Sequence, residues 1–167
     1  MQKGQKYTIS DFGRFIGYFT CHAVWSVESG EALCPFIVRQ KGKERFLERH
    51  EGVYQDTVSK LKKELSSEKK SSIHCLIAYD GFITIGENRL DAILIESKAW
   101  LEEQFQNVVL AIPYRNARVK PGFAVHKPKL LKSEIGDSEY LMTEFWEGVY
   151  EHKKGAKAWD KALDESI

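Results

Sequence analysis

The stretch from residue 72 to residue 100 constrains the fold most, because β-forming residues recur there between sharp turn signals over the longest part of the chain. The predicted strands are residues 73–79, 82–85 and 90–95. Asp80-Gly81 and the segment 86–89 are predicted to be the turns, since glycine reaches positive φ without steric cost. Short connections favour antiparallel neighbours, so we expect an antiparallel meander at the centre of the chain.

Helices are predicted both before and after this meander in the sequence. The first begins at Thr8, whose hydroxyl can cap a helix that carries Asp11 in its first turn. Its apolar residues then recur at helical spacing. A second helix is predicted at residues 51–65 and a third after Asp137, each with an apolar face. Residues 152–167 are expected to form a peripheral helical segment.

A hairpin at residues 35–40 and 44–48 and strands at residues 108–112 and 123–126 are expected to complete a mainly antiparallel sheet. A short helical turn is predicted at residues 100–106. With 167 residues, the chain is long enough for one sizeable core and short for two. We therefore predict a single α+β domain over residues 1–167, in which about three helices pack on the sheet.

The apolar stripes and strands also predict which side chains form the core. The expected core residues are Phe12, Ile16, Phe19, Leu61, Leu76, Ile77, Ile93, Ile95, Val109, Leu110 and Phe145. A flexible N-terminus is expected over residues 1–7.

Composition excludes several classes of protein. The net charge of +1 gives no bulk attraction to nucleic acid or membrane. The chain has neither a run of about 18 apolar residues nor the apolar region of a signal peptide, so no membrane partner is expected. Its three cysteines lie far apart and its five histidines lack metal-ligand spacing. We expect reduced thiols in a cytoplasmic protein, with no cofactor and no metal.

One constellation nevertheless suggests an enzyme. Asp80 followed by Glu96 and Lys98 resembles the pattern of metal-dependent nucleases, in which an acid precedes a Glu-x-Lys on a neighbouring strand. Two carboxylates would hold a divalent cation, and the lysine would position a water near the scissile phosphate. The alternative is a turn aspartate and a solvated strand end. In a plain meander a middle strand would separate Asp80 from Glu96, which favours this alternative.

A charge asymmetry suggests binding. Residues 104–133 contain six basic residues and no acid, whereas residues 134–167 contain nine acids and four lysines. The candidate binding residues are Tyr114, Arg115, Arg118, Lys120, Phe123 and Lys127. Such a loop can pair with the acidic C-terminal helix of its own chain, grip an acidic protein, or contact phosphates and stack bases. For this stretch by itself, internal pairing with solvation is favoured, followed by an acidic protein partner and then nucleic acid.

The sequence therefore favours a non-enzymatic binding protein. Its basic, aromatic-containing loop at residues 113–132 is expected to dock an acidic protein partner, and nucleic acid is the less favoured ligand. A metal-dependent phosphodiesterase that uses Asp80, Glu96 and Lys98 is the alternative. The oligomeric state and the identity of the partner stay open.

Overall fold

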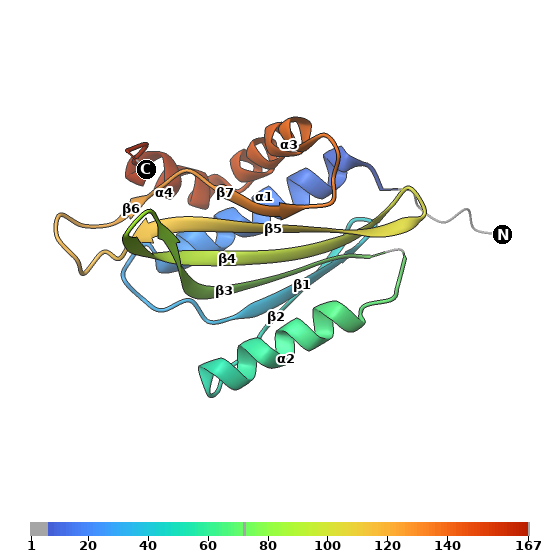
Figure 1. Ribbon diagram of the computed structural model, residues 1–167, viewed down its shortest axis with the longest axis horizontal. Helices are drawn as coiled ribbons and strands as arrows, with labels where there is room; N and C mark the ends of the chain where they lie inside the picture. Colours follow the sequence, from blue (N-terminus) through green and yellow to red (C-terminus); the bar gives the residue numbers. More distant parts are fainter. Residues whose placement is uncertain (1–6, 72, 167) are drawn as a thin grey trace.

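A computed structural model of the chain describes residues 7–71 and 73–166 (Figure 1). Its helices are α1 (Ile9–Val27), α2 (Tyr54–Ser67), α3 (Ser138–Glu151) and α4 (Lys153–Ala162). Its strands are β1 (Phe36–Lys41), β2 (Glu44–Arg49), β3 (His74–Ile85), β4 (Asn88–Leu101), β5 (Gln104–Arg115), β6 (Ala124–Val125) and β7 (Lys129–Ser133). Of the N-terminal residues that the sequence predicts to be flexible, all but Tyr7 lie outside the described part.

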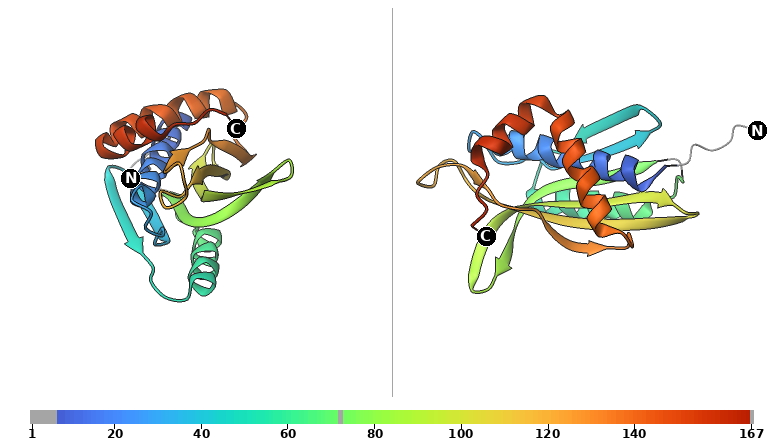
Figure 2. Two further views of the ribbon diagram at one scale, coloured as in Figure 1. Left: turned by 90° about the vertical axis from the view of Figure 1, so that its left-hand side faces the viewer. Right: turned by 90° about the horizontal axis from the view of Figure 1, so that it is seen from above.

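The strands form one seven-stranded antiparallel sheet in the order β2-β1-β3-β4-β5-β6, and β7 also pairs with β5. Figures 1 and 2 show α1, α3 and α4 on one face of the sheet and α2 on the other. The predicted α+β fold with a mainly antiparallel sheet is confirmed. No helix in the described part of the chain is both long and apolar enough to cross a membrane.

Two hydrophobic clusters correspond to the two faces of the sheet. The larger lies under α1, α3 and α4, and the smaller joins α2 to β1 and β3 through residues such as Leu61 and Ile77. Every predicted core residue is buried except Val109, which is half-buried. The predicted core is therefore confirmed. Trp159 of α4 is also 1% exposed and belongs to the larger cluster.

Helices α1 and α3 approach each other closely because each carries a glycine where they cross. A Cβ atom on Gly17 would overlap the backbone carbonyl of Phe145, and one on Gly148 would overlap the carbonyl of Arg14. The start of α1 is fixed by a reciprocal cap, in which Thr8 and Asp11 each accept the backbone N–H of the other. This cap and the helix crossing set where α1 lies across the sheet.

The prediction of a turn at Asp80-Gly81 is wrong. Strand β3 continues through both residues to Ile85, and the turn to β4 lies at Gly86, which has a φ of 62°. Gly81 instead allows the Leu94 side chain to lie close to the backbone of β3, since a Cβ at residue 81 would lie 2.9 Å from the Cδ1 atom of Leu94. Strands β3 and β4 are therefore immediate neighbours, paired from Cys75 with Lys98 to Ile85 with Asn88.

The predicted helical turn at residues 100–106 is also wrong. Strand β4 runs to Leu101 and β5 begins at Gln104, so a two-residue turn joins them. Glu102 and Glu103 have φ values of 52° and 63°, the left-handed backbone that a tight hairpin turn requires at both central positions. Strand β7 lies in a segment for which the sequence predicted no element.

Candidate functional site

A cavity of about 600 Å³ lies at one end of the sheet, where Asp80 of β3 meets the segment before β1 and the end of β5. The Tyr114 hydroxyl lies 2.9 Å from each carboxylate oxygen of Asp80 and donates to that group. Tyr54, at the start of α2, donates its hydroxyl to the backbone carbonyl of Asp80. Asp80 thus links three separate elements at the wall of the cavity.

Asp91 is a second carboxylate on the same wall. It pairs with Phe82, while Asp80 pairs with Ile93, so the two acids lie diagonally on neighbouring strands and share a face of the sheet. Burial raises the pKa of Asp80, and the negative charge of Asp91 raises it further, while the Tyr114 hydrogen bond opposes the rise. This wall can therefore hold a proton or accept a cationic group. Asp91 was not singled out from the sequence, because the false turn at Asp80-Gly81 hid this neighbour relationship.

Glu96 and Lys98 lie on the opposite face of the sheet from Asp80. Glu96 pairs with Ile77 and Lys98 with Cys75, two residues of the cluster under α2. Asp80 pairs with Ile93, which belongs to the cluster under α1. The three predicted residues consequently do not converge, although β3 and β4 are neighbours. Their separation comes from the alternation of side chains along a strand and involves no intervening strand.

The polar ends of Glu96 and Lys98 are occupied by contacts within the chain. The Tyr79 hydroxyl donates to Glu96 Oε2 at 2.6 Å, and Lys62 Nζ lies 3.8 Å from the same oxygen. Lys98 Nζ donates to the backbone carbonyls of Leu65, Ser66 and Glu68, at 3.4, 3.3 and 2.7 Å. Lys98 therefore caps the C-terminal end of α2, where the Leu65 carbonyl also accepts the Glu68 N–H at 3.3 Å. Over residues 7–71 and 73–166, no three His, Cys, Asp or Glu side chains gather as metal ligands.

The expected loop at residues 113–132 is not one continuous loop, because residues 113–115 end β5, residues 124–125 form β6 and residues 129–132 belong to β7. The name basic loop is kept for residues 113–132, and its aromatic residues face inward. Tyr114 is 5% exposed and Phe123 packs against the core, with the two ring centroids 6.4 Å apart in an edge-to-face arrangement. Arg115 is half-buried and its Nε donates to the carbonyl of Gly122 at 2.7 Å. These three side chains anchor the loop to the sheet.

Arg118, Lys120 and Lys127 are the exposed members of the predicted set. Arg118 makes an exposed ion pair with Glu31, with 3.7 Å between Nη2 and Oε1. The acids of α3 contact a different cation: Arg14 Nε lies 2.9 Å from Glu144, and its Nη1 lies 3.5 Å from Glu151. In the described part of the chain, no ion pair joins the basic loop to α3.

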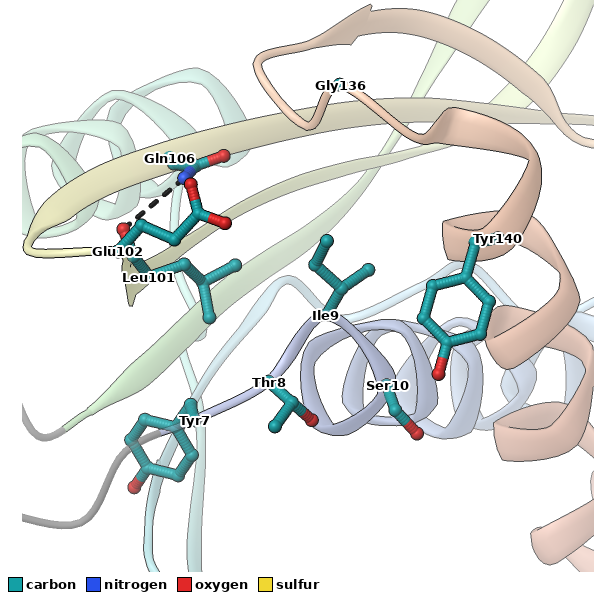
Figure 3. A pocket seen from close by; sticks show the side chains of 9 residues that line it. All are labelled: Tyr7, Thr8, Ile9, Ser10, Leu101, Glu102, Gln106, Gly136 and Tyr140. Atoms are coloured by element: carbon teal, nitrogen blue, oxygen red, sulfur yellow. Dashed lines mark hydrogen bonds between the residues drawn. The ribbon is translucent and has the colours of Figure 1, made fainter.

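A further cavity of about 370 Å³ lies at the start of α1 (Figure 3). Leu101, Glu102 and Gln106 of the β4–β5 hairpin form one side, and Tyr140 of α3 lies on the other. The Gln106 amide donates to the carbonyl of Leu101 at 3.3 Å. The start of this helix is capped by Thr8 and Asp11, whose side chains accept each other's backbone N–H.

Comparisons with models of known families, with curated proteins and with solved structures gave no significant match to this chain.

Proposed function

We propose that this chain is a non-enzymatic binding protein that docks an acidic protein partner on its basic loop. The observation that carries the proposal is that some side chains of the loop anchor it to the sheet while its other cations are exposed. Its aromatic residues and Arg115 anchor it, while Arg118, Lys120 and Lys127 project to solvent. A cation with no structural partner is available to an external carboxylate, and Lys120 and Lys127 have no ion pair in the described residues.

The backbone of the loop supports this proposal because it is held in a defined conformation. The Val119 N–H donates to the carbonyl of Asn116 at 2.9 Å, and the Gly122 N–H donates to the carbonyl of Val119 at 2.8 Å. The Asn116 side chain also accepts the Arg118 N–H at 2.9 Å. An ordered loop loses less conformational entropy on binding than a flexible one, which favours a pre-formed docking surface.

Nucleic acid is the less favoured ligand of this surface. Binding of single strands relies on bases that stack on exposed aromatic rings, and Tyr114 and Phe123 are committed to the interior. The phosphodiesterase alternative has less support, because Asp80 lies on the opposite face from Glu96 and Lys98. A cytoplasmic location is part of the proposal, since free thiols at Cys21, Cys34 and Cys75 suit a reducing compartment.

The test is a binding titration with a labelled glutamate-rich peptide and a single-stranded oligonucleotide of equal charge. We expect the peptide to bind more tightly, with an affinity that falls as salt is raised. The triple variant Arg118→Glu, Lys120→Glu, Lys127→Glu should abolish binding. The control, Lys60→Glu, Lys63→Glu, Lys69→Glu, makes the same charge change at exposed positions on and just after α2 and should weaken it far less.

Equal loss in both triple variants would show that net charge, and not the basic loop, governs binding. Preference for the oligonucleotide would reassign the surface to nucleic acid. Absence of binding to either probe would remove the support for a general acidic-partner surface.

A further inference from the structure

A cavity of about 430 Å³ lies between α3, α4, the residues that follow α4 and the segment at Lys127 and Pro128. Three aromatic residues line it: Trp146 and Tyr150 of α3, and Trp159 of α4. Met142, an adaptable apolar side chain, lies on the same wall. This cavity shares no lining residue with the cavity at Asp80.

The three aromatic rings form inclined walls. The Trp146 and Trp159 ring centroids lie 5.2 Å apart with the planes at 64°, and Trp146 and Tyr150 lie 6.4 Å apart with the planes at 34°. Trp159 is 1% exposed and forms the floor, whereas Tyr150 is 50% exposed and forms the rim. Trp146 thus packs against both other rings, and the three form one aromatic cluster at the cavity.

The charged groups on this cavity are mainly acidic. Asp160 and Glu165 line it, with Lys127 as the single cation among its lining residues. Burial raises the pKa of the Tyr150 hydroxyl, and the negative charge of the nearby Asp160 raises it further, so one carboxylate lies beside the rim. The surrounding segment, residues 134–167, carries nine acids and four lysines. An anionic ligand is therefore disfavoured, and a cationic one is favoured.

Among cations, an aromatic wall selects those with weak hydration. A primary ammonium is strongly hydrated, so it gives up much solvation to contact a ring. A quaternary ammonium carries its charge on methyl groups, which contact aromatic faces and lose little hydration, and tryptophan is the best aromatic partner for it. We propose that this cavity binds a trimethylammonium group, with Trp146, Tyr150 and Trp159 as the aromatic wall and Asp160 and Glu165 as the acidic rim.

The first experiment compares two probes of equal shape that differ in charge. Choline and its uncharged carbon analogue, 3,3-dimethyl-1-butanol, are each titrated while tryptophan fluorescence is recorded, with calorimetry as an independent readout. We expect choline to bind about tenfold more tightly or better, because only the cation gains attraction from the rings and the carboxylates. Equal binding of the two probes would show a merely apolar cavity, and absence of choline binding would also overturn the proposal.

The same titration distinguishes two sources of the trimethylammonium group. Blocked trimethyl-lysine represents a methylated peptide, choline represents a small molecule or a lipid headgroup, and blocked unmethylated lysine is the control. Tighter binding of either methylated compound than of lysine supports the proposal and identifies the source. Equal binding of lysine and trimethyl-lysine would contradict selection by the rings.

Variants then assign the binding to this cavity. Trp146→Leu keeps an apolar side chain and removes the ring, so choline affinity should fall about tenfold, and Trp146→Phe should retain part of it. Trp25 is 37% exposed and lies outside the cavity, so Trp25→Leu is the matched control and should leave affinity unchanged. Circular dichroism and the melting temperature confirm that each variant is folded. Loss of binding in Trp25→Leu, or none in Trp146→Leu, would place the choline site elsewhere.

Discussion

The Nδ1 atom of His22 lies 3.1 Å from the Nε2 atom of His152, so the two imidazoles form a direct hydrogen bond between α1 and the start of α4. His152 Nδ1 accepts the backbone N–H of Gly155 at 2.9 Å and thereby caps α4. The proton of a neutral His152 must then lie on Nε2, from which it is donated to His22 Nδ1. A neutral His22 then carries its own proton on Nε2, so the nearby Arg49 guanidinium acts on it as a charge and not as a hydrogen-bond donor. This chain of hydrogen bonds requires both rings to be neutral.

Charges around the pair also oppose its protonation. Arg49 Nη2 lies 3.2 Å from His22 Nε2, and Lys154 lies near His152. Burial lowers the pKa of His22 to about 4, with further contributions from His152 and Arg49. Burial likewise lowers the pKa of His152. Because the unfolded chain binds these protons near pH 6.5, the fold should be most stable above that pH.

We therefore expect the free energy of unfolding to fall as the pH is lowered from about 6.5 towards 4, where the unfolded state binds more protons than the folded one. Buried His74, whose pKa burial lowers to about 4, contributes with the same sign. His22→Phe should reduce the slope over this range, as measured by urea unfolding at a series of pH values. His50→Phe is the control. A slope unchanged in His22→Phe would show that the histidine pair does not carry the pH dependence.

The crossing of α1 and α3 yields a second prediction. Gly17→Ala or Gly148→Ala would drive a methyl group into the backbone of the facing helix, so each should lower the free energy of unfolding by about 3 kcal/mol or more. Gly136→Ala is the control, because a Cβ there meets no heavy atom within 4 Å. Chemical denaturation of the three variants makes the comparison. A cost below about 1 kcal/mol at both helix positions would mean that the helices can separate freely.

The sequence predicted most elements because their signals are local. The Thr8 cap, the apolar stripe of α1 and the run of β-forming residues in β3 depend on neighbouring residues. The elements that were predicted wrongly depend on contacts or turn geometry that the neighbouring residues do not reveal. Gly81 suggested a turn, yet it makes room for Leu94 on the next strand, and no residue near it reveals that contact. The left-handed turn at Glu102 and Glu103 lacks the glycine or asparagine that normally marks it.

The candidate site was predicted less well, for a related reason. Charge asymmetry identified the basic loop, but which of its side chains are exposed depends on the packing of Tyr114 and Phe123. The Asp80 cavity depends on Asp91 and Tyr114, which meet Asp80 only through strand register. Side-chain alternation along β4 likewise separates Glu96 and Lys98 from Asp80, and this follows only once register is known.

The basic loop gives a third prediction, in which stability separates anchoring from exposed residues. Arg118→Ala with Lys120→Ala should change the melting temperature by only about one or two degrees, since exposed ion pairs contribute little. Arg115→Ala should cost about 1 kcal/mol or more, because it removes the donor of the Gly122 carbonyl. Differential scanning calorimetry compares the variants. A large drop in the double variant would indicate that those cations are structural, which would weaken the docking proposal.

The last prediction distinguishes a structural from a catalytic role for Lys98. As the cap of α2, Lys98 satisfies three backbone carbonyls while it is 9% exposed. Lys98→Met keeps much of the side-chain length and removes the donors, so it should cost about 1–3 kcal/mol in the free energy of unfolding. Lys63→Met is the exposed control on α2 and should change stability by less than about 0.5 kcal/mol.

If the chain were a nuclease, substitutions at Glu96 and Lys98 would remove activity and leave the fold intact. Glu96→Gln and Lys98→Met would then abolish cleavage of DNA or RNA by a folded protein supplied with Mg²⁺ or Mn²⁺. We expect no such cleavage by the unaltered chain, because a cation with oxygen ligands at about 2.0–2.6 Å cannot bridge carboxylates on opposite faces of a sheet. Glu96→Gln should cost little stability, since the new amide oxygen still accepts the Tyr79 hydroxyl. Metal-dependent cleavage that both substitutions abolish, without loss of fold, would make Glu96 and Lys98 catalytic.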